Sequence, residues 1–371
     1  MSLRIVITTT LNDNLYHAKL IPLLRAREDV EIVVVTDHEG PTLDRVRWVW
    51  PRGLSRFLGR LGGRFLLLLG QVLHPRTKAV MAYNIIPHGL FAVVAAWPRR
   101  IPVFLHFIAG AADFKFAHNP QITDNRLILR TKHPARYEKL AQWTTRHGNR
   151  LFVPGRNTAV SLRELGLPDE RIVRLHSTID PQIYFRQDES RDIDVLVSAQ
   201  LRPRKRPLFA LEVFKRILEK RPQTRFCWLG DGPLHDEFAE SVKQLGLSKS
   251  LEWTETNNVA PFYRRARVFL LCSINEGLSL ACMEAMACGM VPVTTDCGDM
   301  CEIVRNGHTG RLLPVDAEQE IFTQAVLELL DNSIDWQHCS QASSELICQE
   351  HSFPAAIKTW KQLLNTIQFS E

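Results

Sequence analysis

Residues 273–290 read SINEGLSLACMEAMACGM and place two carboxylates close to an apolar run. Glu276 and Glu284 stand eight positions apart, and small or apolar residues fill most of the stretch between and after them. A buried carboxylate without a partner is costly, so such a pair needs partners. What those partners are decides what the protein does.

The neighbouring sequence places this stretch at the end of a buried strand. Residues 267–272 are expected to form the strand, 273–279 a loop, and 280–288 a helix that ends at Gly289. The amino end of that helix carries unpaired N–H groups and the positive end of the helix dipole. Both favour an anion such as a diphosphate, and Gly277 lets the backbone approach it closely.

The two carboxylates suit the hydroxyl groups of a sugar. Glu276 lies just before the helix and Glu284 about one turn inside it. Because a carboxylate accepts several hydrogen bonds, it can bind vicinal hydroxyls. A nucleotide sugar has such hydroxyls on both sides of its diphosphate. The alternative is structural: Glu284 pairs with a nearby arginine and Glu276 is solvated.

Buried strands alternate with helices through most of the chain. The expected strands cover residues 4–10, 31–36, 79–84, 102–108, 150–155, 194–199, 225–230, 251–255, 267–272 and 291–296. Apolar strands separated by helices indicate parallel sheets covered on both faces. The sequence therefore predicts an α/β protein of two Rossmann-like, doubly wound domains, with a crevice at the carboxyl ends of their strands.

A change of pattern near residues 177–192 suggests the domain boundary. This segment contains Pro181 and a run of charges. We therefore expect a first domain over 1–180 and a second over 190–350. The stretch 352–371 is expected to hold a helix that could pack on either domain, the first included.

Composition is typical of a globular protein, but the charge is uneven. Of the 371 residues, 23% are charged and 45% hydrophobic. Residues 1–180 hold 26 Lys and Arg against 14 Asp and Glu, a balance of +12, and the remainder carries −6. A basic half suits an anionic membrane surface or an anionic substrate; a nucleic acid partner is not expected.

Two further features bear on location. The eight cysteines form no C-x-x-C pair, and a strand begins next to Met1 without a preceding signal peptide, so we expect free thiols and a cytoplasmic protein. Residues 79–98 carry no formal charge and could span a bilayer by length. However, Pro87 and Gly89 interrupt them, which predicts a strand, a turn and a helix.

The stretch 273–314 strongly resembles the donor-binding region of the retaining glycosyltransferases of family 4, which have the GT-B fold. The E-x7-E pattern of that family falls on Glu276 and Glu284. Residues 226–247 resemble its strand, Gly-Asp-Gly turn and helix, and 152–185 its interdomain crossover. The resemblance implies transfer of a sugar from a nucleoside diphosphate sugar to a hydroxyl, with the anomeric configuration kept.

The resemblance also assigns roles to particular residues. It implies that Glu276 contacts the donor sugar, that Glu284 binds the ribose, and that Lys205 neutralises the departing diphosphate. No metal or other cofactor is implied. The remaining donor contacts implied by the resemblance are the backbone of Gly277, Leu278, Ser279 and Leu280, and the turn at Gly230 and Gly232.

Two positions depart from the family pattern. The arginine five residues before the lysine is replaced here by Gln200. In an extended chain Arg202 points to the same side as Gln200, so it could supply the missing positive charge. Alternatively, Arg202 could simply be exposed. The loop 8–14 lacks the usual glycines, which leaves the shape of the acceptor pocket open.

On the acceptor side, the resemblance implies a histidine at the crevice. His106 is the best match, and the alternative is a strand histidine within the core. His88 is a weaker candidate for the same role.

Four arginines recur at helical spacing before the third expected strand. Arg52, Arg56, Arg60 and Arg64 share one face, opposite an apolar one formed by Leu54, Phe57, Leu58, Leu61, Phe65 and Leu68. Such a helix can lie on anionic lipid, here at the inner face of the plasma membrane. The alternative is a helix that covers its own sheet and exposes solvated arginines.

The sequence therefore predicts a retaining glycosyltransferase that acts on a lipid-linked or polysaccharide acceptor in envelope glycan biosynthesis. Gln200 motivates an alternative, a catalytically weak GT-B domain that serves as a binding subunit. A dinucleotide-dependent oxidoreductase is a further alternative. It would need G-x-G-x-x-G after the first strand, where residues 8–14 contain no glycine.

Overall fold

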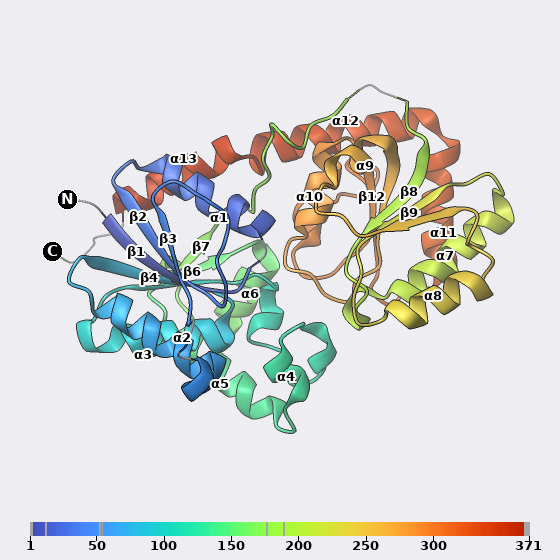
Figure 1. Ribbon diagram of the computed structural model, residues 1–371. Coiled ribbons are helices and arrows are strands. Elements are labelled where there is room, and N and C mark those ends of the chain that lie inside the picture. Colours follow the sequence, from blue (N-terminus) through green and yellow to red (C-terminus); the bar gives the residue numbers. More distant parts are fainter. Residues whose placement is uncertain are drawn as a thin grey trace. The chain divides into compact units, whose positions relative to one another are not determined.

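The chain forms two units in the computed structural model, residues 1–177 with 353–371 and residues 178–352. The structure describes residues 3–11, 13–51, 53, 55–175, 177–187 and 190–366, without the side chains of Ser55, Arg56 and Thr366. Figure 1 shows that each unit is a sheet with helices on both faces.

The first unit is built on a parallel sheet, which has seven strands in the described residues. Their spatial order is β3 (Val46–Val49), β2 (Val30–Val35), β1 (Leu3–Thr8), β4 (Thr77–Tyr83), β5 (Val103–His106), β6 (Arg150–Val153) and β7 (Ile172–Arg174). The central strands β1 and β4 are buried along almost their whole length, as expected for a sheet covered on both faces.

Helices cover the two faces of this sheet with separate apolar cores. One core includes Tyr16, Leu20 and Leu23 of α1 (Asp13–Ala26) and Trp360 and Leu364 of α13 (Phe353–Thr366), so the C-terminal helix belongs to the first unit. The other core lies under α2 (Ser55–Leu73), α3 (Leu90–Ala96), α5 (Pro134–His147) and α6 (Arg156–Glu164). The short helix α4 (Arg126–Arg130) adds the buried Ile128 to it.

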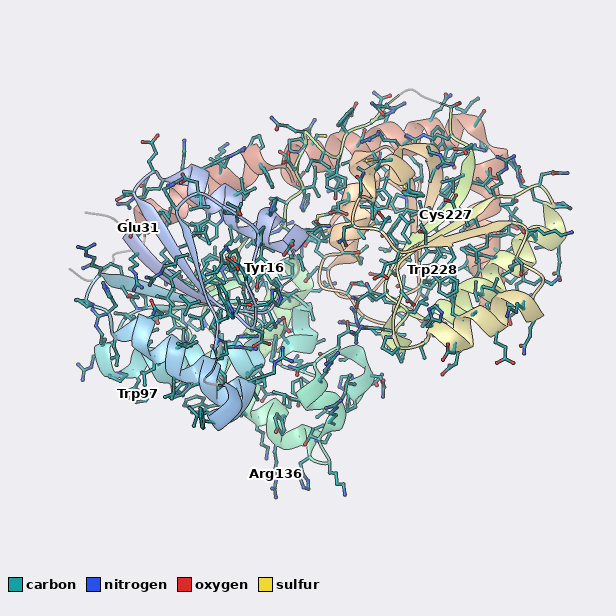
Figure 2. All side chains as sticks on the ribbon, viewed as in Figure 1. Tyr16, Glu31, Trp97, Arg136, Cys227 and Trp228 are labelled. Carbon is teal, nitrogen blue, oxygen red and sulfur yellow. The ribbon has the colours of Figure 1, made fainter. Side chains whose placement is uncertain are left out.

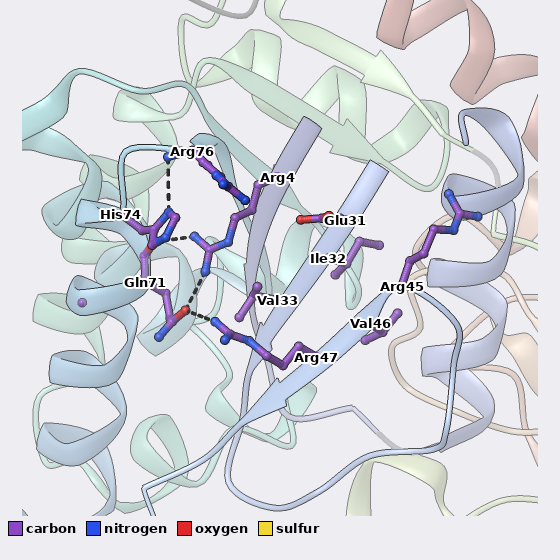
Figure 3. A pocket seen from close by; sticks show the side chains of 11 residues that line it. Arg4, Glu31, Ile32, Val33, Arg45, Val46, Arg47, Gln71, His74 and Arg76 are labelled. Atoms are coloured by element: carbon purple, nitrogen blue, oxygen red, sulfur yellow. Dashed lines mark hydrogen bonds between the residues drawn. The ribbon is translucent and has the colours of Figure 1, made fainter. Parts of the chain in front are cut away.

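The carboxyl end of α2 is capped by side chains from the sheet. Arg4 on β1 donates to the carbonyl oxygen of Gln71 at 3.0 Å (Figure 3). Thr77 on β4 donates to the same oxygen at 2.8 Å. Arg99 donates to the carbonyl of Val72 at 2.9 Å. These cations satisfy carbonyls that the helix itself leaves unpaired and lie at the negative end of its dipole.

The second unit is also built on a parallel sheet, which has six strands in the described residues. Their order is β10 (Leu251–Thr254), β9 (Phe226–Leu229), β8 (Ile193–Ser198), β11 (Ala266–Leu271), β12 (Val291–Thr295) and β13 (Arg311–Leu313). Successive side chains enter opposite cores: Cys227 belongs to one and Trp228 to the other (Figure 2).

The helices of this unit divide between the same two cores. The core of Trp228 includes residues of α7 (Pro207–Lys220), α8 (His235–Gln244) and α11 (Gln319–Asp331). The core of Cys227 includes residues of α9 (Ala260–Arg265), α10 (Leu280–Ala287) and α12 (Ser333–Glu350). The sequence prediction of two Rossmann-like α/β domains is confirmed.

The uncharged stretch 79–98 forms most of β4, a short π-helical turn over Ile85–Gly89, and α3. This matches the predicted strand, turn and helix. In the part of the chain that the structure describes, no helix is both long enough and apolar enough to cross a membrane.

Candidate donor-binding site

The loops that follow β8 and β11 meet at the carboxyl edge of the second sheet, where these two strands are neighbours. The N–H of Ile274 donates to the carbonyl of Arg204 at 2.9 Å, and the Arg204 guanidinium donates to the carbonyl of Asn275 at 2.6 Å. From behind, the hydroxyl of Thr295 at the end of β12 donates to the carbonyl of Ser273 at 2.5 Å. These bonds fix the loop that carries Glu276.

Glu276 is 7% exposed and is held by two cations. Its Oε1 atom forms an ion pair with Nζ of Lys205 and lies 3.3 Å from Nη1 of Arg204. Burial would raise the pKa of this carboxyl, but Lys205 and then Arg204 outweigh it and lower the pKa to about 2. Glu276 is therefore ionised at neutral pH.

This arrangement answers the question raised by the two glutamates in part. Two of the residues predicted to act together, Glu276 and Lys205, do lie in contact. The alternative of a solvated Glu276 is wrong, because its side chain is buried against protein cations. In this state the partners of Glu276 are Lys205 and Arg204, which a donor diphosphate would also attract.

Glu284 is 6% exposed and has a different environment. It lies in α10 and receives a hydrogen bond from the hydroxyl of Tyr184. Burial raises its pKa to about 8, although the Tyr184 bond opposes this shift. Among the described residues no arginine forms an ion pair with it. A neutral carboxyl both donates and accepts, which suits a pair of ribose hydroxyls.

The raised pKa of Glu284 predicts a pH-dependent stability. Between pH 4.5 and about 8 the folded protein keeps a proton that the unfolded chain has lost, so the free energy of unfolding falls as pH rises through this window. The loss is on the order of a few kcal/mol. Glu284→Gln should remove this loss of stability. The melting temperature of the variant, relative to that of the wild type, should therefore rise from pH 5 to pH 9.

A matched control is Glu328→Gln, which changes an exposed carboxyl on α11. It should leave the difference between pH 5 and pH 9 unchanged. If Glu284→Gln and wild type gave parallel curves of melting temperature against pH, Glu284 would be ionised throughout. Another group would then have to stabilise its buried charge.

The amino end of α10 lies directly after Glu276 in the chain. Ser279 is the N-cap residue, and its hydroxyl accepts a long bond of 3.4 Å from the N–H of Cys282. Leu280 is the first residue of the helix, and Leu278 is buried in the core beneath it. The predicted diphosphate contacts, Gly277 to Leu280, thus form the turn into this helix.

A glycine that sequence reasoning missed supports this turn from behind. Gly298 has φ +57°, and a Cβ there would lie 1.6 Å from the carbonyl oxygen of Glu276. The next residue, Asp299, donates its N–H to the carbonyl of Gly277 at 2.9 Å. The backbone of the loop after β12 therefore packs directly against the backbone of the loop that carries Glu276. Only glycine at position 298 permits this close approach.

The structure shows where Arg202 lies, and its role in donor binding stays a prediction. Its Nε donates to the side-chain oxygen of Gln200 at 2.7 Å, so Arg202 binds the residue that replaces the family arginine. The cation beside Lys205 and Glu276 is instead Arg204, which was not predicted. Its signal was the basic run 202–206, in which the extended-chain argument selected a different arginine.

Positions 230 and 232 require glycine for a steric reason that the sequence did not suggest. A Cβ on Gly230 would lie 2.5 Å from the carbonyl oxygen of Ala199, and one on Gly232 would lie 2.7 Å from that of Leu201. The turn after β9 thus packs closely on the loop that leads from β8 to Lys205. Its predicted contact with the nucleotide stays a prediction.

His106 ends β5 in the first unit and is 3% exposed. Its ring stacks on Phe152 at 4.5 Å between centroids and lies 4.3 Å from the ring of Tyr83. Burial, and then Lys19, holds its pKa well below the usual range. Aromatic packing holds the ring within the core, as in the alternative that the sequence left open. Its catalytic role stays a prediction.

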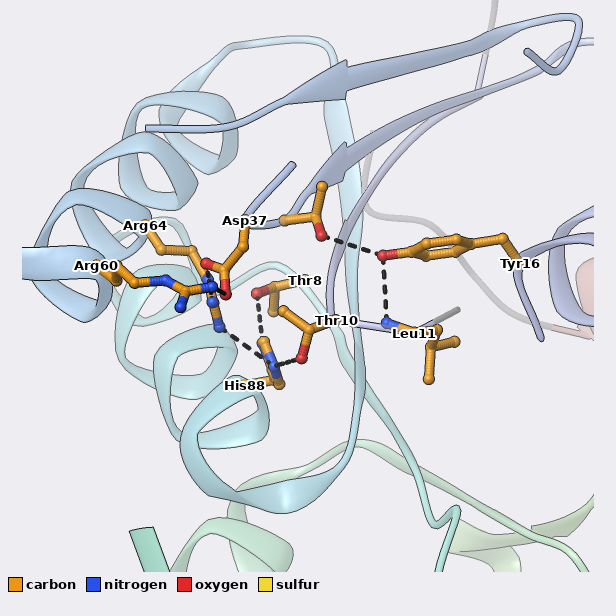
Figure 4. Close-up of polar contacts among 9 residues, drawn as sticks. Thr8, Thr10, Leu11, Tyr16, Asp37, Arg60, Arg64 and His88 are labelled. Atoms are coloured by element: carbon orange, nitrogen blue, oxygen red, sulfur yellow. Dashed lines mark hydrogen bonds and ion pairs between the residues drawn. The ribbon is translucent and has the colours of Figure 1, made fainter. Parts of the chain in front are cut away.

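A polar network lies instead at the carboxyl ends of β1 and β2, around His88 (Figure 4). The His88 ring nitrogens lie 3.1 Å from the hydroxyl of Thr8 and 3.3 Å from that of Thr10. Burial, and then Arg64, lowers the His88 pKa to about 3, so the ring is neutral at physiological pH. The network gives the weaker histidine candidate better-placed polar partners than His106 has.

The same network corrects one member of the predicted arginine face, Arg64. Arg64 is 3% exposed and forms an ion pair with Asp37, so it faces the interior (Figure 4). Arg60 also pairs with Asp37, at 2.8 Å, and stays largely exposed. Arg52 lies outside the described residues, as does the side chain of Arg56. Gly59, with φ 69° and ψ 170°, interrupts the helix and breaks the regular spacing.

Comparison with known proteins places this chain in a family. A model of the glycosyl transferases group 1 matches residues 182–345, and a model of the glycosyl transferase 4-like domain matches residues 15–178. N-acetyl-alpha-D-glucosaminyl L-malate synthase of Bacillus anthracis is 28% identical over 183 residues, 46% of this chain and 48% of that protein. The chain spans about half the length of the curated relatives it matches.

Solved structures agree in fold over nearly the whole chain. Anabaena HepE in complex with UDP and glucose has a TM-score of 0.77 at 14% identity, covering 98% of this chain and 100% of that one. Sucrose-phosphate synthase of Thermosynechococcus elongatus also has a TM-score of 0.77, at 12% identity, with 98% of each chain covered. The chain therefore belongs to the group 1, family 4-like glycosyltransferases with the GT-B fold.

Proposed function

We propose that this protein transfers a sugar from a nucleoside diphosphate sugar to a hydroxyl group, with retention of the anomeric configuration. The observation that carries the proposal is the contact between Glu276 and Lys205 beside the amino end of α10. An anion bound there meets unpaired backbone N–H groups and two side-chain cations at once. We propose that no metal ion takes part.

We propose the following sequence of events for these residues. Before donor binds, Lys205 and Arg204 neutralise Glu276 and keep the carboxylate in place. The diphosphate of the donor then competes for Lys205, which frees an oxygen of Glu276 to accept a bond from a sugar hydroxyl. As the glycosidic bond breaks, negative charge grows on the diphosphate, and the fixed cations lower the barrier.

Names of related proteins support a glycan or lipid-linked acceptor. One relative, from Campylobacter jejuni, is a galactosaminyltransferase that acts on an undecaprenol-linked saccharide, with 24% identity over 189 residues. Another, from Salmonella typhi, is a Vi polysaccharide biosynthesis protein, with 30% identity over 122 residues. We propose an acceptor of this kind, in envelope glycan biosynthesis.

We also propose reversible contact with an anionic membrane, in a cytoplasmic setting. The amino end of α2 exposes apolar side chains, with Phe57 85% and Leu58 49% exposed, next to the exposed Arg60. This combination favours the headgroup region of a bilayer. Sedimentation with anionic and neutral vesicles tests it; failure to bind anionic vesicles at low salt would remove the membrane from the proposal.

Donor binding and hydrolysis test the main proposal. UDP-, GDP- and ADP-sugars should be screened for thermal stabilisation, since a donor at about 100 times its Kd adds about 2.7 kcal/mol to the folded state. The right donor should raise the melting temperature by a few degrees and be hydrolysed slowly without acceptor. Glu276→Ala should abolish hydrolysis, whereas Glu328→Ala, an exposed change on α11, should not.

The same measurement separates the alternative. Stabilisation by a donor without hydrolysis, even with glycan acceptors added, would favour a binding subunit in which Gln200 marks lost activity. Absence of stabilisation by every nucleotide sugar would contradict the donor site itself.

A further inference from the structure

The first unit holds a cavity at the opposite end of its strands from the His88 network. It has a volume of about 660 Å³ and lies against the start of β1, β2 and β3 and the last turn of α2. Arg4 is the second residue of β1, whereas Thr8, which binds His88, is the last. The cavity is therefore separate from the carboxyl edge of this sheet.

The pairing of the strands explains which side chains reach the cavity. Arg4 is the register neighbour of Glu31, and Val33 is the register neighbour of Arg47. Because side chains two apart on a strand share a face, these residues all lie on the face covered by α2. The turn after α2 adds His74 and Arg76 (Figure 3).

Positive charge dominates this cavity. Three guanidinium groups, those of Arg4, Arg47 and Arg76, line it together with one carboxylate, the exposed Glu31. A fourth lining arginine, Arg45, is turned to backbone carbonyls, among them that of Leu24 at 2.8 Å. Desolvation and then the positive charges of Arg4, Arg76 and Arg47 lower the pKa of His74, as a positive potential at this position requires.

A neutral oxygen joins two of the cations. The side-chain oxygen of Gln71 accepts a bond from Nη2 of Arg4 at 2.6 Å and one from Nη2 of Arg47 at 2.7 Å. Two like charges are thus held close together without a carboxylate between them, which is unfavourable until an anion arrives. Arg4 is only 5% exposed and is fixed by α2, so the arrangement cannot simply relax into solvent.

Donors remain for a ligand. A guanidinium has five N–H donors, and Arg47 uses one of them on Gln71. The guanidinium of Arg76 has no hydrogen-bond partner or ion pair within the described ranges. A single guanidinium can bind two oxygens of a phosphate in planar, bidentate geometry. The volume is that of a small-molecule pocket and exceeds the needs of a phosphate ion alone.

We propose that this cavity binds the phosphate group of a small phosphorylated molecule. Arg47 and Arg76 donate to the phosphate oxygens, and Arg4 is a positioning residue that acts through Gln71. Nothing in this assignment depends on the sugar-transfer proposal, because the cavity shares no residue with the donor site of the second unit.

The probe is inorganic phosphate, followed through the His74 resonance by NMR and assigned with His74→Gln. Phosphate should shift this resonance saturably and raise the His74 pKa, because it neutralises the cations that lower it. Arg47→Gln combined with Arg76→Gln should weaken phosphate binding by about tenfold or more. Arg136→Gln, an exposed arginine on α5, is the matched control and should change nothing.

Two further variants distinguish a cavity from exposed charge. A Cβ on Gly70 would meet nothing within 4 Å, so Gly70→Leu can occupy the cavity while every arginine stays. It should abolish the His74 shift, and Glu31→Gln should strengthen phosphate binding. Phosphate binding to Gly70→Leu as tight as to wild type, or an unchanged midpoint in the double arginine variant, would overturn the proposal.

Anionic vesicles form the second arm of the test. If vesicle binding needed Arg47 and Arg76 while free phosphate left His74 unmoved, the arginines would serve lipid headgroups, and the small-molecule assignment would be wrong. Phosphate binding that depends on these arginines, with vesicle binding that does not, would support it.

Discussion

Replacing Lys205 by alanine is expected to lower the rate of sugar transfer by about 10²- to 10³-fold. Lys205 is in contact with Glu276, and its side chain is only 14% exposed, so little water screens its charge. Negative charge on the diphosphate grows as the donor bond breaks, so kcat should fall more than donor affinity. Single-turnover hydrolysis at saturating donor, together with donor Kd from thermal shifts, measures both.

Neighbouring cations provide graded controls. Arg204→Ala should also lower turnover, because Arg204 lies 3.3 Å from Glu276. Arg202→Ala should cost far less, since its guanidinium binds Gln200. Lys215→Ala removes an ammonium from α7 that pairs only with Glu219 among the described residues, and should have no effect. Wild-type turnover in a folded Lys205→Ala variant would mean that other groups neutralise the leaving diphosphate.

The sequence predicted the central strands well because strands buried on both faces consist of nearly continuous apolar residues. Each of the ten expected strands is present, within a few residues of its predicted bounds. The strands β3, β7 and β13 were missed. All three lie at sheet edges, are short and only partly buried, and each contains an arginine. An edge strand needs no continuous apolar run, so the pattern that reveals a central strand is absent.

Within the site, residue spacing along the sequence identified the two glutamates but not the residues that contact them. The carboxylates Glu276 and Glu284 follow from a spacing along one segment, whereas Arg204 and Tyr184 reach them through folding. The sequence did not single out Arg204, because a short 3₁₀ turn, Pro203–Lys205, sets where its side chain lies. Likewise, helical spacing predicted that Arg64 is exposed. In the structure it forms an ion pair with Asp37, which follows β2, and its side chain is buried.

Gly298→Ala should be among the most damaging single changes in the second unit. Alanine at φ +57° costs about 1–2 kcal/mol in backbone strain. Its Cβ would also lie 1.6 Å from the Glu276 carbonyl oxygen, closer than any non-bonded contact allows. The loop must therefore shift, at a further cost of about 1–3 kcal/mol. We expect a lower melting temperature and loss of donor binding, because the displaced backbone carries both Glu276 and the turn into α10.

A second glycine separates the two causes. Gly246 has φ +71°, but a Cβ there would meet nothing within 4 Å. Gly246→Ala should therefore show the strain alone: a melting temperature lowered less than in Gly298→Ala, and donor binding intact. Thermal unfolding with and without nucleotide sugar compares the two variants directly. If Gly298→Ala bound donor as tightly as Gly246→Ala does, the loop after β12 would not be what holds Glu276 in place, and the ion pairs with Lys205 and Arg204 would have to suffice.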